Sequence, residues 1–445
     1  MRVVEFYSGI GGHHAALKLA LEATQDDGQS IHSKNSSITE SRDESNDKFN
    51  VVRAFDMSEH AQATYEHYWK SPKVSRRNIL FLKPELGVEY DELCHADLFI
   101  MSPPCQPYSR RKQKKHSQAP DRSGQEDRRA WSLHHLIERM QNDDDFLPRL
   151  LLLENVLGFE NSESFEKLTA MFDARGFTWQ AIVLSPHMLG IPNSRPRLFV
   201  LAKRNSSFAI PQWTNQVIQE TETDPERRQA QTDNAQEHIF WVDQGSILKS
   251  ILSDAGVSGD NIIPRESGAL CPVRDFLEHN MSHEDRATFG IDPVVLWKAG
   301  NYFDVITPSS LRSSCFTKSY AYFHGGAGSV ICNDLSAQEI QQVYEKFFTE
   351  RNAIIEAAEP NKPNWKQVVE ERGGCPTLES LKLRYFMPHE IARLLGFPED
   401  FAFHPESSLR QRYALLGNSL SVHNVALLLR YLVAEPKLTN TDTQS

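Results

Sequence analysis

The sequence predicts an α/β protein built on a doubly wound sheet. Short apolar runs with the length of buried strands recur through the first 204 residues, and segments of helical periodicity lie between them. Glycine residues follow the first run and an aspartate ends the second, as in folds that bind a nucleotide at the ends of their strands. Alternation of this kind favours a sheet with helices on both faces.

The first two expected strands carry a candidate site for a small ligand. A strand over 3–6 leads through the glycine-rich turn 7–12 into a helix over 13–23. Glycine lets the backbone approach a ligand, and free N–H groups at the start of a helix favour an anion. The second strand, over 51–56, ends at Asp56, whose carboxylate suits either ribose hydroxyls or the N-cap of the next helix.

The segment 97–110 has the most distinctive pattern in the chain. Its apolar first half predicts a buried strand, which Pro103 and Pro104 stop because proline cannot donate a ladder hydrogen bond. Cys105 therefore lies on a stiff turn just past the carboxyl end of a strand, where open α/β sheets bind ligands. Taken alone, such a cysteine is more often a small buried apolar residue.

Charged residues flank two later strands. Strands are expected at 150–153, 179–184 and 198–202, with a helix over 165–172. Glu154 follows the first of these strands, and Arg195 and Arg197 precede the last. Each has an ordinary explanation, as a surface carboxylate or an ion-pair partner, but their order along an α/β pattern that also carries Cys105 points to one site.

The end of the chain is again strongly patterned. Pro388 opens a helix through Leu395 and Gly396 closes it, which is the usual placement of proline at a helix start and glycine after its end. A final helix is expected over 422–432.

Composition indicates a soluble intracellular protein. The chain is 40% hydrophobic and 24% charged, has no apolar run near the roughly 20 residues needed to span a bilayer, and starts without a signal-peptide pattern. The six cysteines are scattered, so neither a disulfide framework nor a zinc site is expected. The net charge of −11 argues against indiscriminate nucleic-acid binding, although eight Lys/Arg against three Asp/Glu over 110–129 make either a basic patch or a solvated loop.

Five ordered motifs resemble those of the cytosine-C5 methyltransferases. They are Phe6-Tyr7-Ser8-Gly9-Ile10-Gly11-Gly12, Pro103-Pro104-Cys105-Gln106, Glu154-Asn155-Val156, Arg195-Pro196-Arg197 and Gly417-Asn418-Ser419. Ser314-Cys315-Phe316-Thr317-Lys318 resembles the signature of the eukaryotic tRNA-aspartate (cytosine-5) methyltransferase branch, and the segments 191–195, 383–386 and 394–398 look typical of it. The resemblance covers most of the chain outside two polar insertions and the tail.

The resemblance implies a Rossmann-like S-adenosylmethionine-dependent methyltransferase sheet with a smaller target-recognition domain. We expect the following organisation: a catalytic domain over 1–204 with a disordered insertion at 26–48, a target-recognition region over 205–381 with a polar insertion at about 205–240, a segment over 382–434 that returns to the catalytic domain, and a disordered tail over 435–445. The protein is expected to be a monomer in the cytoplasm, the nucleus or both.

The implied reaction transfers a methyl group from S-adenosylmethionine to C5 of a cytosine in the anticodon loop of tRNA, with tRNA-Asp as the expected substrate. Cytosine C5 is a poor nucleophile, so Cys105 Sγ first adds to C6. Glu154 would hold or protonate N3, and Arg195 and Arg197 would orient the base carbonyl and the carboxylate through their planar guanidinium groups.

The resemblance also assigns binding residues. For the cofactor they are Ile10, Gly11 and Gly12 at the methionine end, Asp56 at the ribose, Ile79, Leu80 and Ser102 at the adenosine, and Ser419 closing the pocket. For the nucleic acid they are Arg110, Arg111, Lys112, Lys114, Lys115, Cys315, Phe316 and Thr317. No metal ion and no membrane are expected as partners.

The motif around the nucleophile departs from the family pattern. Tyr108 and Ser109 stand where the family usually has Phe and Thr, which keeps the ring and the hydroxyl. The main alternative function is a DNA (cytosine-5) methyltransferase that uses the same catalytic residues. A second alternative is a catalytically silent nucleic-acid-binding scaffold.

Overall fold

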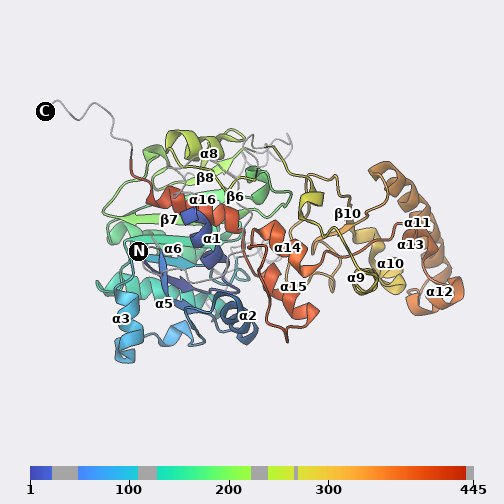
Figure 1. The fold of residues 1–445 in the computed structure, drawn as a ribbon, viewed down its shortest axis with the longest axis horizontal. Coiled ribbons are helices and arrows are strands. Elements are labelled where there is room, and N and C mark those ends of the chain that lie inside the picture. The colour runs from blue at the N-terminus through green and yellow to red at the C-terminus, as the bar shows by residue number, and fades with distance from the viewer. Residues whose placement is uncertain (23–48, 109–127, 222–238, 265–268, 437–445) are drawn as a thin grey trace, which may run out of the picture.

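A computed structural model describes residues 1–22, 49–108, 128–221, 239–264 and 269–436 (Figure 1). The insertion expected at 26–48, the basic residues 110–115 and most of the expected tail therefore lie outside the described residues. Among the described residues, no helix combines the length and the apolar character that crossing a bilayer requires.

Nine strands form one sheet in the order β3-β2-β1-β4-β5-β7-β6-β8-β9. Their bounds are β1 Arg2–Phe6, β2 Asn50–Phe55, β3 Val74–Ser75, β4 Leu98–Met101, β5 Leu150–Asn155, β6 Phe177–Leu184, β7 Arg197–Arg204, β8 Val217–Glu220 and β9 Ile239–Val242. All neighbours are parallel except β7, which is antiparallel to both β5 and β6. The predicted doubly wound sheet is confirmed, and its strand order reverses between β1 and β4, where such folds bind ligands.

Helices cover both faces of this sheet (Figure 1). α1 (Gly12–Glu22) and α16 (Val422–Val433) pack on one face, and α5 (Arg128–Asn142) and α6 (Glu163–Ala174) pack on the other. Alternate residues of a strand point to opposite faces, so Leu98 and Phe99 of β4 belong to different hydrophobic clusters.

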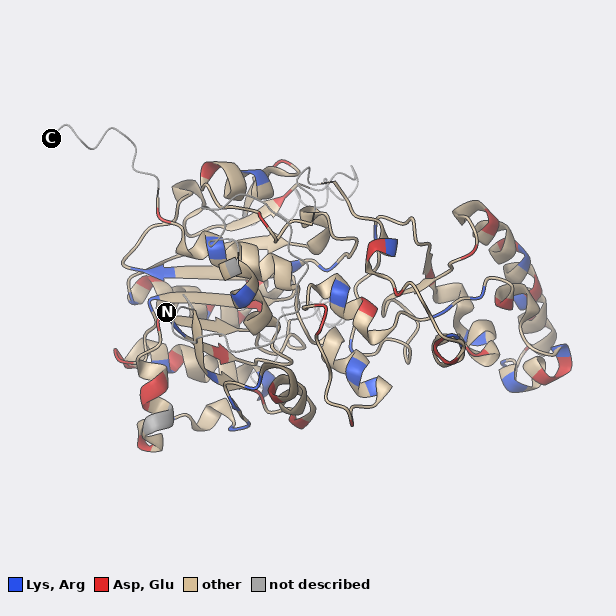
Figure 2. Cartoon of the chain, in the orientation of Figure 1, with Lys and Arg blue, Asp and Glu red and all other residues tan. Residues whose placement is uncertain are grey.

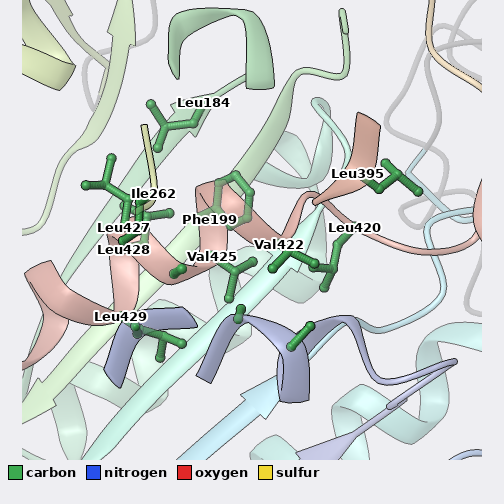
Figure 3. Packing of buried hydrophobic residues seen from close by; sticks show 14 of the residues in the cluster. Leu184, Phe199, Ile262, Leu395, Leu420, Val422, Val425, Leu427, Leu428 and Leu429 are labelled. Atoms are coloured by element: carbon green, nitrogen blue, oxygen red, sulfur yellow. The ribbon is translucent and has the colours of Figure 1, made fainter. Parts of the chain in front are cut away.

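α16 lies against α1 even though the two helices are at opposite ends of the chain. Val425, Leu428 and Leu429 of α16 are buried beside Phe199 of the sheet (Figure 3). The buried Arg430 donates from Nε to the carbonyl oxygen of Ala20 at 3.1 Å, which ties the two helices together.

The sheet continues beyond residue 204, where the sequence suggests that the first domain ends. β8 pairs with β6, and β9 pairs with β8, although both strands lie in or beside a polar stretch. Only Val217 and Ile218 of β8 are buried, which explains why its hydrophobic pattern is too short to predict a strand.

A second group of elements lies to one side of the sheet, with its own hydrophobic cluster around Trp297 and Phe347 (Figure 1). Its elements are α9 His283–Phe289, α10 Pro293–Ala299, β10 Asp304–Ile306, β11 Ser329–Ile331, α11 Ala337–Ala358, α12 Trp365–Arg372 and α13 Pro376–Glu379. The remaining helices are α2 Glu59–Trp69, α3 Val88–Cys94, α8 Ser246–Lys249, α14 Pro388–Leu395 and α15 Leu409–Gly417. α14 and α15 lie between the sheet and the second group (Figure 1).

Candidate active site

The loop after β4 holds Cys105 at the carboxyl edge of the sheet. Asn155, the last residue of the neighbouring β5, donates from Nδ2 to the carbonyl oxygen of Pro103 at 3.2 Å. The backbone N–H of Tyr108 donates to the carbonyl oxygen of Cys105 at 3.1 Å, which closes a turn. These two hydrogen bonds fix the loop at the edge where the sequence predicts a site. Cys105, on this loop, is only partly buried.

The hydroxyl of Tyr108 fastens the same loop from the other side. This side chain is 1% exposed, and its Oη donates to Ser164 Oγ of α6 at 2.9 Å. Ser164 Oγ also lies 2.8 Å from His134 Nε2 of α5. Tyrosine in place of the phenylalanine usual in the motif thus adds a hydrogen bond between the nucleophile loop and the helices beneath it.

Glu154 and Arg197 form an ion pair beside this loop. β5 and β7 run antiparallel, so the end of one strand and the start of the other lie at the same edge of the sheet. Arg197 Nε is 3.1 Å from Glu154 Oε1, and the two side chains are 16% and 11% exposed. The structure therefore brings together a thiol, a carboxylate and a guanidinium group, as the sequence predicts.

Arg195 has a different set of contacts. Its Nη1 donates to the carbonyl oxygen of Phe316 at 3.1 Å, and its Nη2 donates to the carbonyl oxygens of Gly417, at 3.2 Å, and Ser419. This guanidinium is buried and holds three distant segments of the chain together. It is thus a positioning group in the structure, whereas Arg197 contacts the Glu154 carboxylate.

The charges around the two thiols shift their pKa values in opposite directions. Burial raises the pKa of Cys105, Arg197 opposes this shift, and Glu154 adds to it. Burial also acts to raise the pKa of Cys315, but Arg195 and Arg197 beside it lower the pKa overall. The raised pKa therefore favours the neutral thiol of Cys105. Its proton must be removed before Sγ can act as a nucleophile.

The glycine turn after β1 is tightly constrained. Gly11 has φ +85°, and a Cβ built there would lie 2.0 Å from Trp69 Nε1. Trp69 Nε1 donates to the carbonyl oxygen of Ile10 at 3.1 Å. Around Gly9, in contrast, a Cβ would meet nothing within 4 Å, which leaves the turn open to a ligand.

Asp56 joins the end of β2 to this turn. Its Oδ2 accepts from the backbone N–H of Gly9 at 2.9 Å, and its Oδ1 accepts from the N–H of Ser58 at 2.8 Å. The N-cap of α2 is Ser58, so the N-cap interpretation of Asp56 is wrong. Burial raises the pKa of the Asp56 carboxyl.

Other predicted cofactor residues surround the same turn. A Cβ on Gly12 would lie 3.2 Å from Ser419 Oγ, so Ser419 lies against the glycine turn. Ser102 Oγ lies 3.0 Å from Nε2 of the buried His13, a partner that the sequence did not indicate. Ile79 is buried against the Phe55 cluster, and Leu80 is half-buried beside it. An open glycine turn, a strand-end carboxylate and a sheet switch point fit a nucleoside cofactor.

A buried polar cluster supports the turn from behind. Glu5 of β1 is fully buried beside Tyr65, whose Oη lies 2.8 Å from His14 Nδ1. The His14 ring stacks on Trp69 with centroids 4.3 Å apart. Burial raises the pKa of Glu5 to about 8, and Tyr65 offsets this only in part.

The predicted nucleic-acid residues are placed unevenly. Phe316 is 3% exposed and packs on Tyr320 and Phe386, so its ring does not contact a nucleic acid. Cys315 is partly buried against Arg195, and Thr317 is half-buried. Among the described residues, no group of three or more His, Cys, Asp or Glu side chains is arranged to hold a metal ion.

The chain is similar to known proteins along almost its whole length. The model of the C-5 cytosine-specific DNA methylases matches residues 1–433. A tRNA (cytosine(38)-C(5))-methyltransferase of Rattus norvegicus is 31% identical over an alignment of 451 positions that covers 97% of this chain and 99% of the relative. A DNA (cytosine-5)-methyltransferase of Dictyostelium discoideum is 28% identical over 98% of this chain and 94% of its own length. The crystal structure of a Spodoptera frugiperda DNMT2 mutant has a TM-score of 0.62 and 26% identity, and covers 97% of this chain and 99% of that one.

Proposed function

The chain belongs to the C-5 cytosine-specific DNA methylase family, and from this premise we propose that it methylates C5 of a cytosine in tRNA. The predicted enzyme class, an S-adenosylmethionine-dependent cytosine-C5 methyltransferase, is confirmed. The narrower part of the proposal is that the target lies in the anticodon loop of tRNA-Asp. Support for tRNA comes from the Rattus norvegicus relative, which carries that substrate in its name and covers 97% of this chain.

The observation that carries the proposal is the Glu154–Arg197 pair beside the Cys105 loop. All three groups lie at one edge of the sheet, and the glycine turn with Asp56 lies on the neighbouring strands of the same edge. A cytosine placed between them would meet a nucleophile and a carboxyl group while its C5 faces the cofactor side.

The residues of this chain would act in a defined order. The Cys105 thiol loses its proton, and Sγ forms a bond to C6 of the cytosine. The electron pair of the C5–C6 bond becomes available at C5, and a proton shared between the Glu154 carboxyl group and N3 neutralises the charge that develops there. S-adenosylmethionine supplies the methyl group. Loss of the C5 proton then reforms the double bond and releases Cys105.

The positive charge of Arg197 has two consequences for this sequence. It opposes the effect of burial on Cys105, which makes the thiolate easier to form. It also fixes the Glu154 carboxyl group, since Nε is within hydrogen-bond distance of Oε1. The base must leave its stack to reach these groups, which is less costly in a loop than in a duplex.

Methyl transfer to tRNA and to DNA, measured side by side with purified protein, tests this function. Bisulfite sequencing of the tRNA should show one methylated cytosine in the anticodon loop, and Cys105→Ala should abolish it. Activity on DNA alone would replace tRNA with DNA as the substrate. Equal methylation by Cys105→Ala and the unmodified chain would remove the covalent step. RNA binding with no methylation of tRNA or DNA by the unmodified chain would favour the silent scaffold.

A further inference from the structure

A turn beside the catalytic residues presents an aromatic ring to solvent. Tyr322 is 50% exposed, and the guanidinium carbon of Arg410 lies over its ring, 5.1 Å from the centroid. Phe323, the next residue, is 52% exposed. The other aromatic residues of the same segment, Phe316 and Tyr320, are buried, so the exposure of Tyr322 is not a general property of the segment.

The turn is held in place by buried neighbours. Tyr320 donates from its Oη to the carbonyl oxygen of Ser329 at 2.6 Å and accepts from the N–H of Phe386 at 2.9 Å. The N–H of Tyr322 donates to the carbonyl oxygen of Ser319 at 3.0 Å. Ala321 has φ +64°, a conformation that residues with a Cβ rarely adopt and that persists where the surroundings impose it. Tyr322 is therefore presented by a preformed turn.

The same turn is continuous with the catalytic site along α15. A Cβ on Gly417, at the end of this helix, would lie 2.1 Å from the backbone nitrogen of Lys318. The carbonyl oxygen of Gly417 also accepts from Arg195. Arg410 is in the first turn of α15, so at 1.5 Å per residue it lies about 10 Å along the axis from Gly417. At this separation a base on Tyr322 and Arg410 would belong to a different nucleotide from one at the Arg195 end of α15.

The charges near Tyr322 suit a nucleic acid. Lys318 and Arg410 are both exposed, and basic residues follow one another along α15 (Figure 2). The chain as a whole has a net charge of −11, so the cation over the Tyr322 ring is a local feature. Two exposed rings beside cations make a smaller and more polar surface than the contiguous apolar patch expected of a protein-docking surface.

We propose that Tyr322, together with Arg410, forms a stacking platform for a nucleobase of the substrate RNA a few nucleotides from the target cytosine. Sequence-tolerant binding of unpaired RNA commonly uses aromatic rings and arginine planes in this way. The inference rests on the proposed tRNA substrate, and it adds a contact outside the basic residues 110–115 and the Cys315–Thr317 segment.

The test compares Tyr322→Ala, Tyr322→Phe and, as a matched exposed aromatic on α11, Phe348→Ala. For each we would measure the Kd of a labelled anticodon stem-loop, the KM and kcat with tRNA, and the KM for S-adenosylmethionine. Loss of one stacked base should raise Kd and KM for RNA about 5- to 100-fold in Tyr322→Ala, at unchanged kcat and cofactor KM. Tyr322→Phe and Phe348→Ala should stay within about twofold of the unmodified chain.

Three results would overturn the platform: an RNA affinity of Tyr322→Ala within twofold of the unmodified chain, a loss in kcat alone, or an equal loss in Tyr322→Phe. Because Kd is measured without turnover, failure of the proposed function is recognised separately, as RNA binding without RNA methylation. Stem-loops with one abasic nucleotide at successive positions complete the test. Base removal at one position should weaken binding to the unmodified chain but not to Tyr322→Ala, and the absence of any such position would refute stacking.

Discussion

Replacing Glu5 with glutamine should change how the stability of the protein depends on pH. Glu5 is fully buried in β1, and its pKa of about 8 in the folded protein compares with about 4.5 for an exposed glutamate. Between these two values the folded state holds a proton that the unfolded state has released. Stability is therefore highest below pH 4.5 as far as Glu5 is concerned, and falls as the pH rises towards 8.

The size of this effect follows from the same shift. Each pH unit in the window costs about 1.4 kcal/mol, and less as the pH approaches the folded-state pKa, so Glu5 should cost roughly 2 kcal/mol of unfolding free energy between pH 6 and pH 8. Glutamine has nearly the same shape and does not ionise. The difference between the two proteins isolates Glu5 from other titrating groups, including the half-buried Asp56 and His14.

Urea denaturation of both proteins at half-unit steps from pH 5.5 to 8.5 measures the difference. The free energy of unfolding of Glu5→Gln should fall less steeply with pH. The variant should therefore become more stable relative to the original chain as the pH rises. Parallel curves would show that Glu5 titrates alike in the folded and unfolded states, and the burial argument would be wrong. Because Tyr65, His14 and Trp69 connect Glu5 to the glycine turn, the KM for S-adenosylmethionine should rise over the same pH range only in the original chain.

Three further predictions concern the site itself. Tyr108→Phe removes one buried hydrogen bond and should lower the free energy of unfolding by about 1 kcal/mol, with a reduced kcat, as urea denaturation and kinetics would show. Gly11→Ala places a Cβ against Trp69 at φ +85°, so cofactor binding by calorimetry should be lost or at least tenfold weaker. Burial raises the pKa of Cys105, so the rate of methyl transfer should rise with pH as this thiol ionises. Arg197 opposes the effect of burial, so in Arg197→Gln the rise should move to higher pH. An unmoved profile would contradict the role of Arg197.

Local signals were sufficient to predict the parts of the site that depend on one loop or strand end. The two prolines that stop β4 place Cys105, and the glycine turn places the cofactor side, because each depends only on backbone geometry within a few residues. The doubly wound sheet was predicted correctly from the alternation of strand-like and helical patterns, and the family from the resemblance of five ordered motifs.

Contacts between distant segments could not be predicted in this way. Arg195 carries the same side chain as Arg197, yet its partners are carbonyl oxygens more than 100 residues away, so the sequence gives no indication of its different role. The N-cap of α2 is Ser58, two residues after Asp56. The sequence pattern could not show which of the two residues would be the N-cap, so it left both interpretations of Asp56 open. β8 contains only two buried residues, which are too few to produce a strand pattern.

The pairing of α1 with α16 has a consequence for synthesis of the protein on the ribosome. Ala20 and Arg430 are 410 positions apart, so at about 5–20 residues per second α1 is exposed for roughly 20–80 s before its partner exists. During this interval the apolar face of α1 lacks its partner helix, and a nascent chain in this state is expected to bind chaperones. Ser419, in the segment just before α16, arrives in the same late stretch, so the enzyme gains its fold and the side chain against its glycine turn together at the end of translation.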